Sequence, residues 1–234
     1  MKTIANSTHQ TELNISNILD LMDLWRHYPS YQLERRVDIW VGFFLKAFLE
    51  QKTRQCVRTI IPEFPLRLGT LFPEKEGTRA ANYSCKVDFL VTYRNLSKVT
   101  LLELKTEQGS RNEVQDKVLL AARAAGLSAV IRGVLLLNIA TAAEGKYGCL
   151  LDALVKGGIL KSKQGLLRCA RDDYDIEILY IQPKATGRPE EVGFEEFAVF
   201  LDGLGDTGSS RFAKSLRCWA LNCAGSQQMH SLFR

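Results

Sequence analysis

Two segments of alternating polar and apolar residues, joined by a short polar connection, restrict the fold most. Residues 86–93 and 99–105 each have the two-residue period and the Val, Leu, Phe and Thr content that are typical of a β-strand. The connection over residues 94–98 is short enough to predict an antiparallel hairpin. A turn centred on Asn95 and Leu96 then places Asp88 directly opposite Glu103, with Cβ atoms about 4.5 to 5.5 Å apart.

This pairing puts two carboxylates on one face of the predicted hairpin, together with Lys105. Leu102 and Leu104 face the other way and place apolar positions on both sides of Glu103. Two facing carboxylates on a half-buried surface either share a proton, which raises a pKa, or hold a cation such as Mg²⁺ between them. The Lys105 ammonium could then orient or help deprotonate a water, or neutralise charge on a phosphate. The arrangement suits phosphodiester hydrolysis.

The chain before the hairpin predicts two helices and a strand. Apolar spacing predicts a short amphipathic helix within residues 13–25 and a long helix over residues 33–49, with one broad apolar face. Residues 56–68 predict a strand. Pro62 and Pro65 each lack a backbone donor, so we expect this strand to be short, bent or at a sheet edge.

The chain after the hairpin predicts alternating helices and strands. Ser110 and Glu113 have the spacing of a capping box, and Gly126 suits the end of the helix that they begin. Further elements are expected as a central strand over 130–139, a helix around 150–160, a strand over 175–182 and a helix near 194–204. This order predicts an α/β protein with a mixed central β-sheet flanked by helices. The expected parts are an N-terminal helical extension (1–29), an α/β domain (30–204) and a C-terminal appendage (205–234).

Asp88, followed after the turn by Glu103-Leu104-Lys105, resembles the motif of the PD-(D/E)xK nuclease superfamily, which has the restriction-endonuclease-like fold. In that family the motif lies on such a hairpin between two helices, and the order αβββαβ of its core matches residues 30–182. The resemblance implies a nuclease that acts on DNA with Mg²⁺, for which Mn²⁺ can substitute. It implies that Asp88 and Glu103 bind the metal and that Lys105 acts at the attacking water.

The same resemblance implies roles for two further residues. Glu34 stands where many members place an acidic residue that completes the metal site, although Asp38 lies one turn along and competes with it. Gln115 resembles the glutamine that some exonuclease-type and RecB-like members place beside their metal. Two positions depart from the pattern. Val87 replaces the family's proline, a common departure. Leu119 replaces the tyrosine of RecB-like members, which bears on the exonuclease subclass and not on the fold.

Other interpretations of these residues stay open. Asp88 and Glu103 could each form an ordinary surface ion pair, for example with Lys86 or Lys98, and such pairs contribute only about 0 to 1 kcal/mol. A chain that kept the fold without catalysis would instead bind a protein or nucleic acid. Its contacts with nucleic acid would come from basic stretches such as residues 156–171.

The composition is that of a globular protein with a mild basic excess. The formal net charge of +5 permits a polyanionic partner such as DNA without requiring one. No apolar run reaches the roughly 18 to 20 residues of a membrane-spanning helix, and the N-terminus lacks the apolar core of a signal peptide. We therefore expect a cytoplasmic protein with no membrane partner, whose six cysteines are buried free thiols. A double-strand cut by single sites would require a homodimer.

Overall fold

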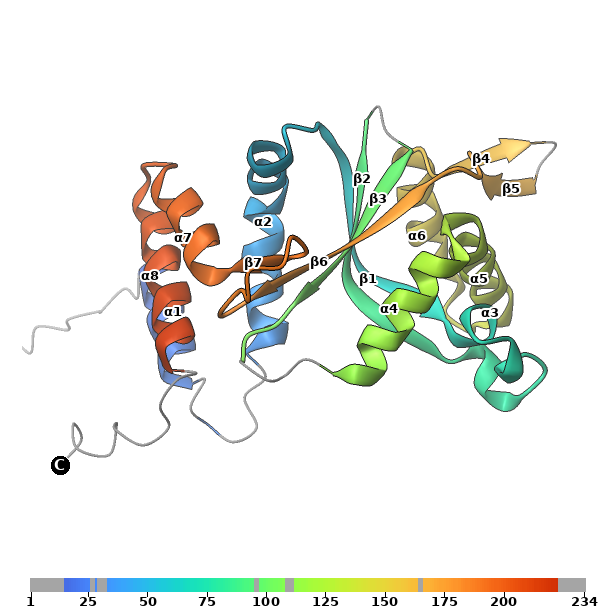
Figure 1. The fold of residues 1–234 in the computed structure, drawn as a ribbon, viewed down its shortest axis with the longest axis horizontal. Helices are drawn as coiled ribbons and strands as arrows, with labels where there is room; N and C mark the ends of the chain where they lie inside the picture. Colours follow the sequence, from blue (N-terminus) through green and yellow to red (C-terminus); the bar gives the residue numbers. More distant parts are fainter. Residues whose placement is uncertain are drawn as a thin grey trace, which may run out of the picture.

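A computed structural model describes residues 15–25, 28, 33–94, 97–107, 112–163 and 166–222 of the chain. At its centre lies a five-stranded sheet in the order β1-β2-β3-β6-β7 (Figure 1). Its strands are β1 (Val57–Arg67), β2 (Ser84–Tyr93), β3 (Lys98–Leu104), β6 (Asp175–Gln182) and β7 (Glu191–Gly193). The pairs β1–β2 and β2–β3 are antiparallel, whereas β3–β6 and β6–β7 are parallel. The predicted α/β class with a mixed central sheet is confirmed.

Helices cover both faces of this sheet (Figure 1). On one side lie α2 (Glu34–Thr53), α7 (Phe194–Asp202), α8 (Thr207–Asn222) and α1 (Ile15–Trp25). On the other side lie α4 (Glu113–Ala125), α5 (Leu127–Ala140) and α6 (Glu144–Lys156). The short turns α3 (Leu68–Leu71), η1 (Pro73–Lys75) and η2 (Arg79–Asn82) connect β1 to β2, and β4 (Leu160–Lys163) pairs with β5 (Leu166–Cys169) in a separate hairpin. Within the described residues, no single helix has the length and apolar character needed to cross a membrane.

The central hairpin has the predicted register. Leu90 pairs with Leu101 and Phe89 pairs with Leu102. Leu90 and Leu101 belong to the buried cluster beneath α4, α5 and α6, whereas Phe89 and Leu102 belong to the cluster beneath α2, α7 and α8. Strand alternation therefore gives each face of the hairpin its own core. The same register, continued by one residue, brings Asp88 opposite Glu103.

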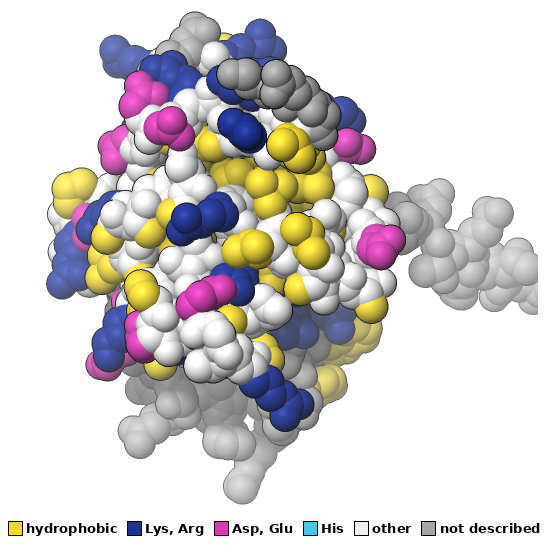
Figure 2. Space-filling view, turned by 90° about the vertical axis from the view of Figure 1, so that its right-hand side faces the viewer, with side chains coloured by type: hydrophobic (Ala, Val, Ile, Leu, Met, Phe, Trp, Pro, Cys, Tyr) yellow, Lys and Arg dark blue, Asp and Glu magenta, His cyan; other side chains and the backbone are white. Residues whose placement is uncertain are grey.

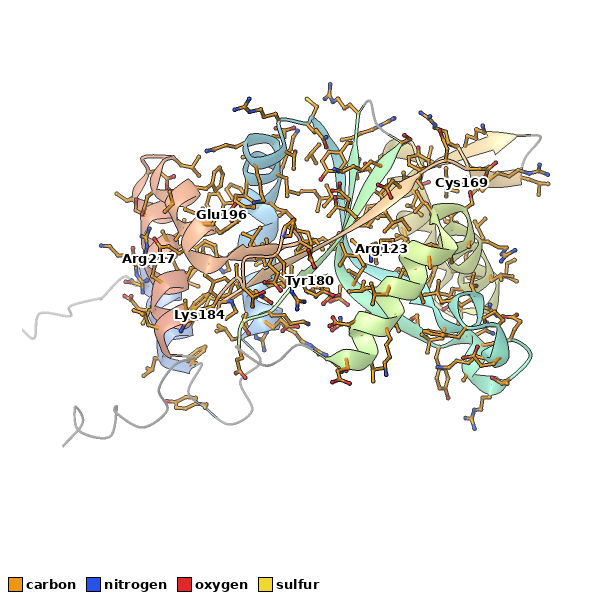
Figure 3. The ribbon with its side chains drawn as sticks, in the orientation of Figure 1. Arg123, Cys169, Tyr180, Lys184, Glu196 and Arg217 are labelled. Atoms are coloured by element: carbon orange, nitrogen blue, oxygen red, sulfur yellow. The ribbon has the colours of Figure 1, made fainter. Side chains whose placement is uncertain are left out.

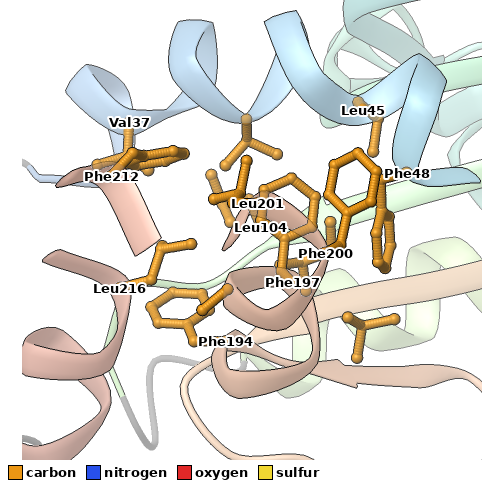
Figure 4. Close-up of a cluster of buried hydrophobic side chains, with 14 of the residues drawn as sticks. Val37, Leu45, Phe48, Leu104, Phe194, Phe197, Phe200, Leu201, Phe212 and Leu216 are labelled. Atoms are coloured by element: carbon orange, nitrogen blue, oxygen red, sulfur yellow. The ribbon is translucent and has the colours of Figure 1, made fainter. Parts of the chain in front are cut away.

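Aromatic side chains join α2 and α7 above the sheet (Figure 4). The Phe48 ring lies edge-on to Phe197 and to Phe200, with centroids 4.7 and 5.4 Å apart. Leu104 of β3 lies in the same cluster. This packing fixes α2, and with it the position of Glu34 at the start of that helix, relative to the end of β3.

The helices of both terminal segments pack beside this layer. Phe212 and Trp219 of α8 are fully buried in the same cluster as the side chains of α2. Arg211 of α8 contacts Asp20 and Asp23 of α1, each at 2.6 Å. Helix α1 therefore packs on α8, and its Leu19 and Met22 belong to the same buried cluster.

Strand β1 lies at a sheet edge and is bent, as its two prolines predict, although its 11 residues do not make it short. Pro62 and Pro65 flank Glu63, which adopts a left-handed conformation with φ of 51°. Proline has no backbone N–H to donate. At a sheet edge the missing donor can face outwards, where no neighbouring strand needs it. The edge position therefore tolerates both residues.

The predicted central strand over residues 130–139 is wrong, because these residues lie in α5. Their buried side chains recur at helical spacing, at Leu127, Val130, Ile131, Val134 and Leu137, and Ile139 is exposed. The continuous apolar run within this segment suits a buried strand as well as a buried helix, so its composition alone did not distinguish them. The fourth core strand is instead β6, which follows a β4–β5 hairpin that the pattern did not predict.

The other helix boundaries differ in smaller ways. Ser110 of the expected capping box lies outside the described residues, and Asn112 caps α4 by accepting the Val114 N–H at 2.9 Å. Gly126 ends α4 as predicted. The helix expected around residues 150–160 begins earlier and ends at Lys156. The remaining predicted helices, and the strand over residues 175–182, are confirmed within a few residues.

The thiols are less buried than predicted. Cys56, Cys149 and Cys218 are exposed, and Cys85 and Cys169 are half-buried. The prediction of buried thiols is therefore wrong for these five residues. Cys223 lies outside the described residues.

Gly126→Ala should lower the free energy of unfolding by about 1 to 3 kcal/mol. Gly126 has φ 77° and ψ 161°, a conformation that is open to glycine and strained for alanine. An added Cβ would meet nothing within 4 Å, so the effect should come from the backbone alone. Gly148→Ala, inside α6 and equally open, is the control and should be stabilising by about 1 kcal/mol. Urea denaturation measures both changes. If Gly126→Ala were as stable as the wild type, the strained conformation assigned to Gly126 would be contradicted.

Candidate active site

Asp88 and Glu103 meet where the ladder between β2 and β3 ends. Oδ2 of Asp88 accepts a hydrogen bond from the N–H of Leu104 at 2.6 Å. This bond replaces the next ladder contact and fixes the Asp88 carboxylate beside Glu103. Burial raises the pKa of Asp88, against the lowering effects of the Leu104 N–H and Lys105.

Glu103 is fully buried, and one of its oxygens lacks a partner. Oε2 accepts a hydrogen bond from Lys105 Nζ at 3.1 Å, whereas Oε1 has no hydrogen-bond partner among the described residues. Burial, followed by the charge of Asp88, raises the pKa of Glu103 to about 8. A buried carboxylate oxygen without a partner is unfavourable. A proton or a cation at Oε1 would therefore stabilise the site.

Lys105 contacts side chains from three elements, two of them acidic and the third a glutamine. Its Nζ lies 3.1 Å from Glu103 Oε2, 3.8 Å from Glu34 Oε1 and 3.1 Å from Gln115 Oε1. Burial alone would lower the pKa of Lys105, but the charges of Glu103 and Glu34 outweigh it, and the pKa is raised. Its backbone N–H donates to Ile181 O at 2.8 Å, which fixes this residue against β6.

The structure brings Glu34 to the cluster from the first position of α2. Burial raises the pKa of Glu34, and the charge of Lys105 opposes that effect. Asp38 lies one turn further along, where its Oδ1 accepts the N–H of Ile39 at 2.6 Å. Of these two acidic residues, Glu34 is therefore the one that we expect to bind a metal.

Gln115 reaches the cluster from the first turn of α4. Its Oε1 accepts from Lys105 Nζ, and its Nε2 lies 3.4 Å from Lys86 O as a donor. The side chain therefore connects the end of β3 to the start of β2. All five residues that the sequence singled out converge at this end of the sheet.

Sequence reasoning missed the residues that surround these five. Tyr180 of β6 donates from its hydroxyl to Asp116 Oδ1 at 2.7 Å, directly beside Gln115. Lys86 pairs with Glu63 at 2.8 Å rather than with Asp88, and the charge of Glu63 also raises the pKa of Asp88. Lys98 likewise pairs with Glu177, at the far end of β3. No short-range pattern marked these contacts, because each joins segments far apart in the sequence.

The donor set of the cluster suits a hard divalent cation. Asp88, Glu103 and Glu34 offer only oxygen atoms, which Mg²⁺ and Mn²⁺ prefer, and Glu103 Oε1 is an oxygen that Lys105 does not use. Among the described residues, no three His, Cys, Asp or Glu side chains already form a compact metal-binding group. Lys105 Nζ instead contacts two of the three carboxylates.

Comparisons of the chain with protein-family models, curated proteins and solved structures found no match.

The basic stretch over residues 156–171 lies on and around the β4–β5 hairpin. Part of its charge is used internally, because Arg171 pairs with Asp173 at 2.7 Å and Lys161 Nζ donates to Ala170 O at 2.7 Å. Figure 2 shows the end of the molecule that lies on the right in Figure 1. Among the side chains drawn in colour there, Lys and Arg are interspersed with hydrophobic and acidic residues. This face therefore does not present a continuous basic track.

Proposed function

We propose that this protein is a Mg²⁺-dependent nuclease that hydrolyses phosphodiester bonds of DNA. The observation that carries the proposal is the buried, unpartnered Oε1 of Glu103, next to Asp88 and Lys105. A carboxylate pair with a raised pKa and a specific lysine partner in one cluster is typical of a functional site. Two carboxyl groups in this position either share a proton or hold a cation between them, and we take the cation as the ligand of the site.

The arrangement of elements supports a restriction-endonuclease-like core. The order α2, β1, β2, β3, α4 and β6 follows the αβββαβ pattern once the inserted α5, α6 and β4–β5 are set aside. Strand β6 returns parallel to β3 after a helical crossover. This order places both acidic strand residues and Lys105 at the same end of the sheet as the first turns of α2 and α4.

Asp88, Glu103 and Glu34 would hold the metal. When bound, Mg²⁺ would polarise the phosphate and lower the pKa of a bound water. Engagement of the carboxylates would free the Lys105 ammonium from its contacts with them. Lys105 would still donate a hydrogen bond to Gln115. Its ammonium would orient the attacking water or neutralise charge that develops on the phosphate.

The wild-type protein should cleave DNA with Mg²⁺ or Mn²⁺ and not with EDTA. Supercoiled plasmid, linear duplex and single-stranded DNA are incubated with each additive and resolved on gels. Glu34→Gln should raise the Mg²⁺ concentration needed for half-maximal cleavage about tenfold or more. Asp38→Asn, one turn along α2, should leave it unchanged.

Two outcomes would contradict the proposal. Cleavage that persists in EDTA would remove the metal mechanism. No cleavage of any substrate, with salt-sensitive DNA binding that needs no metal, would favour a non-catalytic nucleic-acid-binding module instead.

A further inference from the structure

A part-buried hydrogen bond between β6 and α4 lies beside the candidate site. Tyr180 is the strand partner of Glu103 in the β3–β6 ladder, so both side chains project from the same face of the sheet. Tyr180 is 3% exposed. Figure 3 labels it near the middle of the molecule, where β6 passes α4. Its hydroxyl donates to Asp116 Oδ1 at 2.7 Å.

Asp116 is the residue after Gln115 in the first turn of α4. The Tyr180 bond therefore fixes the height and rotation of this turn above β6. Gln115 in turn accepts from Lys105 Nζ at 3.1 Å. A chain of contacts thus runs from Tyr180 through Asp116 and the α4 backbone to Gln115 and the Lys105 ammonium.

We infer that Tyr180 and Asp116 are positioning residues that hold Gln115 on Lys105. The inference rests on the proposed function for its effect on DNA cleavage, although the positioning itself is a property of the metal-free protein. Supporting partners one step removed from a site commonly change affinity or activity by about 10- to 100-fold when they are removed. In this role Tyr180 acts on the site through Asp116 and Gln115.

The chemistry of the bond supports this role. Asp116 is a carboxylate, and a hydrogen bond from a buried donor to a charged acceptor is about twice as strong as a neutral one. A buried tyrosine hydroxyl requires an acceptor in any case, and here the acceptor is the side chain next to Gln115 rather than a backbone carbonyl. Tyr174 offers the comparison, because its hydroxyl donates to the backbone Gly158 O at 3.1 Å, away from the site. Tyr174→Phe is therefore the matched control.

Tyr180→Phe should lower kcat for DNA cleavage about 10- to 100-fold, with KM nearly unchanged. Tyr174→Phe should leave both constants unchanged. A double-mutant cycle with Gln115→Ala tests the route, because the double variant should cleave no more slowly than Gln115→Ala alone. Additive losses would overturn the inference, since Tyr180 would then act independently of Gln115.

A second measurement needs no cleavage. In the metal-free protein, the Lys105 side-chain resonances are assigned by their loss in Lys105→Ala and are then followed by NMR. Tyr180→Phe and Asp116→Ala should shift them in the same direction as Gln115→Ala, and Tyr174→Phe should not. Unmoved Lys105 resonances, with backbone spectra that show a folded protein, would overturn the inference. If the resonances move but the wild type cleaves no DNA, the nuclease proposal fails and the positioning role stands.

Discussion

Lys105→Ala should reduce metal-dependent DNA cleavage by about 10²- to 10⁴-fold, the range over which a positioned proton donor or acceptor contributes to catalysis. The ammonium of Lys105 contacts Glu103, Glu34 and Gln115, so its removal takes the cation from the centre of the cluster. The fold should survive, because Glu103 can take up a proton once its cationic partner is gone. The initial rate of plasmid relaxation at saturating Mg²⁺ measures the loss.

Lys98→Ala is the matched control for this variant. Lys98 begins the same strand and also pairs with a glutamate, Glu177, but at the opposite end of β3. Its removal should leave cleavage within about twofold of wild type, because a partly exposed pair contributes about 1 kcal/mol or less to stability. Full activity in Lys105→Ala would remove the proposed mechanism.

Glu103→Gln should abolish cleavage and at the same time stabilise the metal-free protein. The variant keeps the shape of the side chain and removes a fully buried carboxylate whose Oε1 has no partner. The expected gain at pH 8 is about 3 kcal/mol, because each pKa unit corresponds to about 1.4 kcal/mol and part of the effect is shared with Asp88. Urea denaturation in EDTA measures it.

The gain should depend on pH in a defined direction. The pKa of Glu103 is raised in the folded protein from 4.5 to about 8, so folding favours the protonated form. Its contribution to stability is fully present below about pH 4.5 and is lost as the pH rises towards 8. Wild type and Glu103→Gln should therefore be closest in stability near pH 4.5 and diverge up to pH 8.

Glu177→Gln provides the comparison for the stability measurement. Glu177 is an exposed glutamate on β6 that pairs with Lys98. Its replacement should change the free energy of unfolding by no more than about 0.5 kcal/mol. A Glu103→Gln variant that is less stable than wild type at pH 8 would mean that the carboxylate contributes favourable contacts, against the burial that we describe.

The hairpin and its register were predictable because strand alternation has a period of two and the short connection over residues 94–98 fixes which residues face each other. The helical structure of residues 130–139 was not predictable, because a continuous apolar run lacks the polar positions that distinguish a helix from a strand. The β4–β5 hairpin was missed for a related reason. Its four-residue strands carry Lys and Arg among few apolar residues, so alternation gave little signal.

The convergence of Asp88, Glu103 and Lys105 follows from local spacing, and sequence spacing therefore sufficed to predict it. Glu34 and Gln115 came from the family resemblance, because no local rule determines where the ends of two helices meet a sheet. The Tyr180 to Asp116 bond could not be predicted at all. It depends on the parallel pairing of β6 with β3, which the misassigned strand concealed.

The separation of the site's contacts along the chain bears on the order in which the site assembles during folding. The Leu104 to Asp88 bond closes a loop of 16 positions, whereas the Tyr180 to Asp116 bond closes one of 64. Each doubling of loop length costs about 0.6 kcal/mol of chain entropy, so the second closure costs about 1.2 kcal/mol more. The two strand carboxylates can therefore face each other while α4 is still undocked. In a nascent chain Asp88 and Glu103 would therefore face each other before α4 brings Gln115 to Lys105.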